Sequence, residues 1–192
     1  MSKAMNGARQ FLALGVAAAA ALVAGCSSVH LPPVASRPAT VVVAPLAESE
    51  RAFLTRVAAK SMYEVEVSRL AATRATDPRV RAYAQMLVSR HEQANGELIA
   101  LMSAKGVPPP AGLTAKNATK LHRLASLPAS PEFDKGYVRV VGIEDHAAII
   151  SQFEKVRATA RDRDLKAWID RTLPMLRSQL AVAQTLASTI AA

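Results

Sequence analysis

A small set of polar residues stands where the surrounding sequence is apolar and helical. His91 falls in a stripe of apolar residues that recur at steps of four and three, and Gln179 falls in a similar stripe near the C-terminus. Such stripes are typical of helices that pack in a bundle. Each polar residue lies at nearly the same distance from the predicted start of its helix, so the side chains should share one layer at mid-height. This predicted polar layer consists of Glu64, His91, His146 and Gln179.

The polar layer could serve either of two purposes. Imidazole nitrogens and a carboxylate are good ligands for zinc or copper, so Glu64, His91 and His146 are candidate metal ligands. Bundles build metal sites from side chains of facing helices. Alternatively, the four residues can satisfy one another by hydrogen bonds and fix the register of the helices. We favour the hydrogen-bonded network, and we therefore expect no bound metal and no other cofactor.

Di-iron chemistry of the ferritin type needs a different pattern. It requires a Glu in each of two helices and Glu-x-x-His in each of the other two. The chain contains no Glu-x-x-His, and the layer offers Glu64 alone, with Glu144 as the candidate second carboxylate. No nucleophile–base pair, phosphate-binding loop or dinucleotide motif is found elsewhere. We therefore predict that the protein is not an enzyme.

The helix that should carry His91 has clear start and stop signals. Asp77 can cap its N-terminus, and Pro78 suits the first helical position. Gly106 follows the last periodic residue, and the prolines at 108–110 prevent any continuation. The sequence therefore predicts one long helix over residues 77–105.

Similar signals mark the other helices. The first helix is predicted over residues 49–76, with a tight turn into the second. Residues 106–130 form a long connection with a short helix at 114–126, long enough to travel the length of the bundle. Ser130 and Pro131 restart the chain as a third helix. The fourth follows a cap at Asp162 or Asp164 and contains Pro174, where we expect a local kink. The predicted fold is all-α, an antiparallel four-helix bundle with a long crossover between helices 2 and 3. On the third helix we expect the buried side to be carried by Phe133, Gly136, Val140, Ile143, Ala147 and Ile150.

The N-terminus is organised differently from the rest of the chain. Residues 1–25 have a basic start and a short apolar run, too short to span a bilayer comfortably. They end in Val23-Ala24-Gly25-Cys26, which resembles the signal of bacterial lipoproteins, where the cysteine receives acyl chains such as palmitate before cleavage. An ordinary secretory signal with a cysteine at this place by chance is the alternative. Residues 26–47, rich in proline, are predicted to be a tether, and 48–192 the bundle domain.

Composition limits the partners. The chain carries a net charge of +9, but its arginines are scattered and only 4% of its residues are aromatic. Nucleic-acid binding is therefore not expected. The membrane, reached through the lipid anchor on Cys26, is the expected partner. Ser27 follows the cysteine, which by resemblance to enterobacterial lipoproteins indicates the outer membrane.

Several runs of the bundle domain resemble a family of exported bacterial proteins of unknown function, often described as outer-membrane proteins. They are FLTRVAAKSMYEVEVSRLAATRA, MLVSRHEQAN, SAKGVPPP, FDKGYVRVVGIEDHAAII and LKAWIDRTLPMLRSQL. The resemblance covers about residues 48–187 and implies a ferritin-like fold. In this family an Asp-His pair is typical of the second and third helices, and a histidine of the fourth. Asp145-His146 and His91 match, whereas Arg90 and Gln179 replace the family's aspartate and histidine.

These observations lead to one expected function and one alternative. We expect a non-enzymatic envelope lipoprotein of structural or stress-protective type, in the outer membrane and facing the periplasm. The alternative is a periplasmic metal-binding protein that uses the His and Glu side chains of the polar layer.

Overall fold

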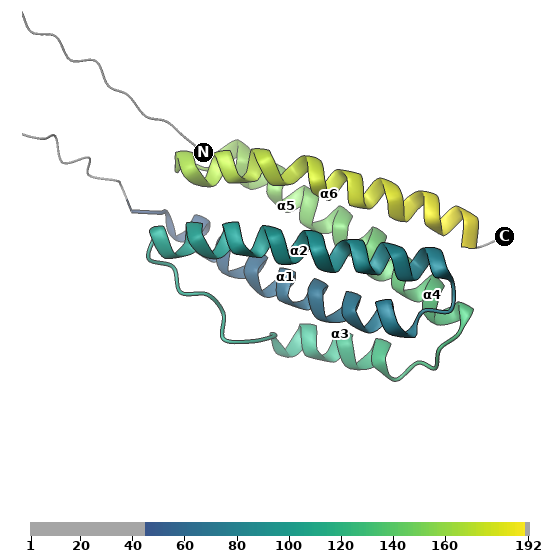
Figure 1. The fold of residues 1–192 in the computed structure, drawn as a ribbon. Coiled ribbons are helices and arrows are strands. Elements are labelled where there is room, and N and C mark those ends of the chain that lie inside the picture. Colours follow the sequence, from purple (N-terminus) through teal and green to yellow (C-terminus); the bar gives the residue numbers. More distant parts are fainter. Residues whose placement is uncertain (1–44, 191–192) are drawn as a thin grey trace, which may run out of the picture. The chain divides into compact units, whose positions relative to one another are not determined.

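A computed structural model describes residues 45–190, and the regular structure in this part of the chain is entirely helical (Figure 1). The all-α prediction is confirmed. The predictions for the signal segment, for Cys26 and for most of the tether fall on residues outside the described range. The helices are α1 (Glu48–Arg74), α2 (Pro78–Ala104), α3 (Ala115–Ala125), α4 (Pro131–Tyr137), the π-helix η1 (Val138–Asp145), α5 (His146–Thr159) and α6 (Arg163–Ile190).

The long helices lie side by side and form a bundle (Figure 1). α1 packs against α2, α6 packs against α2, η1 and α5, and α4, η1 and α5 follow one another without a loop. The short α3 packs on the outside of α1, within the connection between α2 and α4. This connection runs along the length of the bundle (Figure 1).

The predicted helix boundaries are largely confirmed by their caps. The Asp77 carboxylate accepts a hydrogen bond from the Arg79 backbone N–H at 2.7 Å. At the other end of α2, Gly106 has a positive φ of 62°, and the Val107 N–H reaches back to the Met102 carbonyl at 2.8 Å. Of the two candidate caps of α6, Asp162 is the one that accepts from a backbone N–H, that of Leu165 at 2.8 Å.

The first helix ends two residues earlier than predicted because a distant carboxylate holds the turn. Asp134, at the start of the third helical segment, accepts backbone N–H bonds from Thr76 and Asp77. Those two N–H groups are therefore bonded outside the helix. The predicted tether also ends earlier than expected, because Leu46 is buried in the core.

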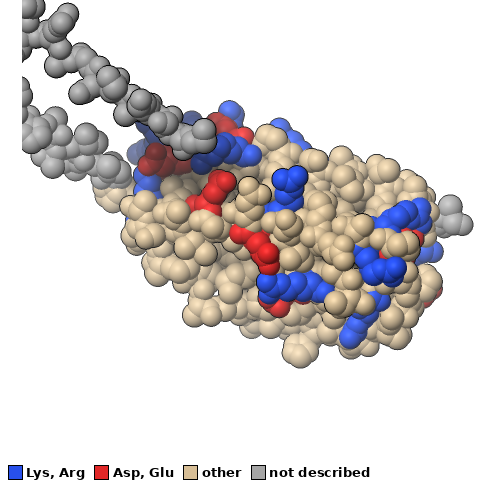
Figure 2. Space-filling model, viewed as in Figure 1, with Lys and Arg blue, Asp and Glu red and all other residues tan. Residues whose placement is uncertain are grey.

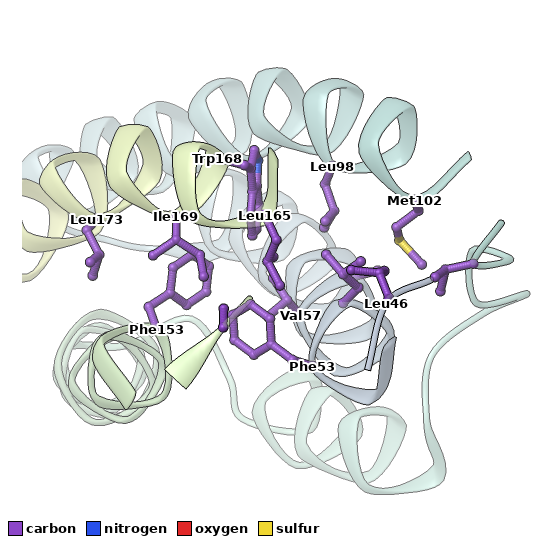
Figure 3. Packing of buried hydrophobic residues seen from close by; sticks show 14 of the residues in the cluster. Leu46, Phe53, Val57, Leu98, Met102, Phe153, Leu165, Trp168, Ile169 and Leu173 are labelled. Carbon is purple, nitrogen blue, oxygen red and sulfur yellow. The ribbon is translucent and has the colours of Figure 1, made fainter. Parts of the chain in front are cut away.

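Two apolar clusters fill the bundle, one toward each end. The first includes Phe53, Phe153 and Trp168. The ring centroid of Phe153 lies 5.1 Å from that of Phe53 and 5.3 Å from that of Trp168. Figure 3 shows side chains of this cluster pointing toward one another from α1, α2, α5 and α6. The second cluster includes Leu87 and Tyr137. The polar layer lies between the two.

The prediction for the buried side of the third helix is confirmed at Phe133 and Ile150 and wrong for the residues between them. Ala147 is exposed, Val140 is only half-buried, and Tyr137, Val138 and Val141 are buried instead. Tyr137 is buried in α4, before η1 begins, and beyond it the i→i+5 hydrogen bonds of η1 turn the later side chains away from the α-helical register. The same segment approaches α6 closely at Gly142, where a Cβ atom would lie 2.8 Å from the Cβ of Ala183. A residue larger than glycine would force these helices apart.

The surface carries charges of both signs. Lys and Arg are interspersed with Asp and Glu on the face shown in Figure 2, without one continuous basic stripe on that face. Between residues 45 and 190, no helix combines the length and the apolar character that a membrane span requires.

Candidate functional site

The four residues of the predicted polar layer are buried in the middle of the bundle. They come from α1, α2, α5 and α6, and each is almost fully buried. Their exposed fractions are 3% for Glu64, 6% for His91, 1% for His146 and 2% for Gln179. Since buried polar groups are costly unless bonded, the partners of each side chain decide what the layer can do.

His146 has both ring nitrogens engaged. Its Nδ1 lies 2.8 Å from the Val141 carbonyl in η1, and a carbonyl can only accept, so Nδ1 carries the proton. In the neutral ring Nε2 is then an acceptor, 3.2 Å from the side-chain oxygen of Gln179. Turning the Gln179 amide by 180° places its NH₂ against Nε2, because amide O and N occupy nearly the same shape. This pair therefore ties α5 to α6.

Among residues 45–190, His91 has a hydrogen-bond partner at only one of its ring nitrogens. Its Nδ1 lies 3.3 Å from the Ser61 hydroxyl of α1, and its ring meets that of His146 edge-on, with centroids 5.9 Å apart. Burial lowers the pKa of His91 to about 4; the nearby Glu64 carboxylate opposes this shift, and the positive charge of Lys60 adds to it. His91 is therefore neutral at neutral pH.

A chain of charges joins the layer to the surface. Lys60 Nζ lies 3.0 Å from Glu64 Oε1 and 2.6 Å from Asp145 Oδ2. Lys120 of α3 contacts the other oxygen of Asp145 at 2.8 Å. Lys60 was not predicted to belong to this site, although it stands four residues before Glu64, a spacing at which helical ion pairs form. The contact with Lys120 depends on the position of α3 and has no local signal in the sequence.

A small cavity of about 30 Å³ adjoins the layer. Three residues that line it carry a buried polar atom without a hydrogen-bond partner among the described residues: Glu64 Oε2, His91 Nε2 and Trp168 Nε1. One water molecule needs roughly 10–15 Å³ of such space, so the cavity has room for about two. Trp168 is the only tryptophan of the chain and thus a natural optical probe of this cavity.

The three candidate metal ligands do not converge on one point. Among residues 45–190 there is no group of three or more His, Cys, Asp or Glu side chains placed to hold a metal ion. The bonds of His146 to Val141 and Gln179 leave Glu64 Oε2 and His91 Nε2 as the free atoms of the candidate set. Glu144, the candidate second carboxylate, lies outside the layer: it is exposed and pairs with Arg139.

Because His91 is buried in its neutral form, we expect the folded chain to lose stability in mild acid. Its pKa is about 4 in the folded chain and about 6.5 when unfolded, so between these values only the unfolded chain binds the proton. Above about pH 6.5 His91 is neutral in both states and does not change the free energy of unfolding. As the pH falls from about 6.5 toward 4, the unfolded chain gains a proton at His91 and the free energy of unfolding falls by about 3 kcal/mol in all. Denaturant unfolding of His91→Gln should show a correspondingly shallower loss over this window. His122→Gln, at an exposed histidine, is the control and should lose stability with falling pH as steeply as the wild type. If His91→Gln also loses stability as steeply as the wild type, His91 is not the group responsible.

Fold and site together define an all-helical bundle domain with a buried polar layer at mid-height. The chain belongs to the family of the domain of unknown function DUF4142, whose model matches residues 35–186. It is also similar in structure to a DUF305 fragment from Deinococcus radiodurans, with a TM-score of 0.66 and 14% sequence identity over 76% of this chain and 99% of that one. At this identity the likeness concerns the fold alone. No curated protein matches the chain.

Proposed function

We propose that this protein is a non-enzymatic lipoprotein of the bacterial outer membrane, anchored through acyl chains on Cys26, with its bundle facing the periplasm. The run Val23-Ala24-Gly25-Cys26 supports the anchor, because small residues before the cysteine suit the extended backbone that signal cleavage requires. Two or three acyl chains anchor a protein stably, at about 0.8 kcal/mol per buried CH₂. Ser27 favours the outer membrane over the inner one.

The proposal includes a ferritin-like four-helix fold. Its support is the order of the helices, with a tight turn between α1 and α2, a long connection before α4, and a tight turn between α5 and α6. One long crossover of this kind is the topology of ferritin-like bundles.

The observation that carries the structural role is the pairing within the polar layer. His146 bonds to Gln179 across two helices, His91 bonds to Ser61 across two others, and Glu64 is held by Lys60. Hydrogen bonds between buried side chains of different helices favour one register of those helices, although Glu64, His91 and the Gln179 amide each keep one buried atom without a partner between residues 45 and 190. Water in the adjoining cavity would complete the bonds of Glu64, His91 and Trp168. The layer then serves the bundle itself, and the protein acts as a structural or stress-protective module of the envelope.

The anchor is tested by Cys26→Ala. The variant should appear in the soluble fraction and lose labelling by radioactive palmitate, because the acylated sulfur is its proposed attachment to the membrane. Ser28→Ala, a substitution of similar size beside the cysteine, is the matched control and should remain membrane-bound and labelled. A Cys26→Ala protein that still requires detergent for extraction would contradict the proposed anchor.

Metal binding in the periplasm is the second candidate function. Metal binding is favoured by two potential ligand atoms at one cavity. Glu64 Oε2 and His91 Nε2 have no hydrogen-bond partner among the described residues, and both side chains line this cavity. A carboxylate and a neutral imidazole together suit zinc, and water would have to complete the coordination.

A further inference from the structure

A groove with basic walls lies on the outside of the bundle, between α1, α3 and α5. Its volume is about 310 Å³, at the small end of the range for ligand pockets. Cationic side chains come from two of its walls: Arg56 and Lys60 from α1, and Lys116 and Lys120 from α3. Asp145 is the one acidic residue of the lining, and Ala148 and Ile149 of α5 provide an apolar wall.

The groove has more positive charge than its own carboxylates neutralise. Asp145 pairs with Lys60 and Lys120, and Glu64 also pairs with Lys60 from the interior. Arg56 and Lys116 are exposed and have no ion pair or hydrogen bond from their side chains to any residue between 45 and 190. Four cations therefore face two carboxylates, which leaves an excess of two positive charges at one small site.

The walls of the groove are fixed by bonds between the helices. Asn117 of α3 donates from its side chain to the Ala59 carbonyl of α1 at 3.1 Å, and Lys120 holds Asp145 from the same helix. α3 is therefore attached to α1 by a hydrogen bond and to Asp145 of η1 by an ion pair. These contacts fix the backbones of the two helices that carry Arg56 and Lys116, so a ligand would have to order only the two side chains on binding.

We propose that this groove binds a small molecule through a phosphate group. A phosphate monoester carries close to two negative charges at neutral pH and thus matches the excess charge. Its oxygens can accept from the planar fork of Arg56 and from the ammonium of Lys116 at once, whereas the apolar wall fits a short carbon skeleton. The proposal concerns the outer surface and holds whether or not the polar layer is structural.

Calorimetric titration of the purified full chain with glycerol 3-phosphate tests the proposal, and glycerol is the ligand control. The double variant Arg56→Gln/Lys116→Gln should weaken binding at least tenfold. The control double variant Arg90→Gln/Lys155→Gln removes the same charge from exposed sites outside the groove and should change binding less than twofold. If both double variants weaken binding equally, glycerol 3-phosphate is attracted by the net positive charge of the protein and not by the groove, and the proposal is wrong.

A second titration identifies the source of the phosphate group. Vesicles that contain phosphatidylglycerol present it as a lipid headgroup, whereas glycerol 3-phosphate presents it in solution. Binding of either probe that depends on Arg56 and Lys116 supports the groove, and the probe that binds more tightly identifies the source. No heat with glycerol 3-phosphate and no groove-dependent binding of the vesicles would overturn the proposal.

Discussion

Leu87→Asp is expected to leave the bundle unfolded at room temperature. Leu87 is fully buried in the second apolar cluster, on the same stripe of α2 that carries His91. A carboxylate placed there has no cation to pair with in its apolar surroundings, and burying it costs several kcal/mol. A domain of this size is stable by about 5–15 kcal/mol, so one such change removes much or all of the stability.

The measurement is far-ultraviolet circular dichroism of the full chain with temperature. Gln85→Asp is the matched control, because Gln85 lies on the same helix, is exposed, and receives the same new side chain. The control should melt cooperatively near the wild-type temperature. If the Leu87→Asp protein melts at the same temperature as its control, Leu87 is not buried in the core of the bundle.

Lys60→Met is expected to destabilise the chain by about 3 kcal/mol, at the lower end of the cost of breaking a buried ion pair. Lys60 is the direct partner of Glu64, whose side chain is only 4% exposed, and its loss leaves that carboxylate buried and uncompensated. The lower end applies because Lys60 itself is 19% exposed and because Lys120 still holds Asp145. Methionine keeps the length and the apolar stem of the side chain.

A second substitution separates the lost charge from lost packing. In the double variant Lys60→Met/Glu64→Gln the carboxylate is neutral, so most of the stability should return. Denaturant unfolding of the wild type, both single variants and the double variant gives the coupling energy of the pair. If the double variant is as unstable as the sum of the single ones, Lys60 and Glu64 do not act together.

The helices and their ends could be predicted because their signals are local. Asp77, Pro78 and Gly106 act on the backbone next to them, and Leu87, His91 and Leu98 of the α2 stripe are buried as its helical pattern predicts. The common height of the four polar residues could also be predicted, because residues halfway along helices of similar length lie at the same level of a bundle. These parts of the structure depend on residues near one another in the sequence.

The missed features depend on contacts between distant residues. η1 is stabilised in part by packing, with Gly142 close to Ala183 and Tyr83, and its effect on register is invisible to an α-helical pattern. The early end of α1 depends on Asp134, far along the chain. The charge chain from Glu64 through Lys60 and Asp145 to Lys120 requires the positions of three helical segments at once.

We propose that the polar layer of Glu64, His91, His146 and Gln179 is a structural network and not a metal site. Thermal unfolding of the full chain with and without excess Zn²⁺ or Cu²⁺ tests it most directly, with Trp168 fluorescence followed in the same samples. A metal that binds only the folded chain at a hundredfold excess over its Kd stabilises it by about 2.7 kcal/mol. We predict that neither metal raises the wild-type melting temperature or changes the Trp168 signal. A rise in melting temperature that both His91→Gln and His146→Gln abolish would contradict the structural account and establish the layer as a metal site.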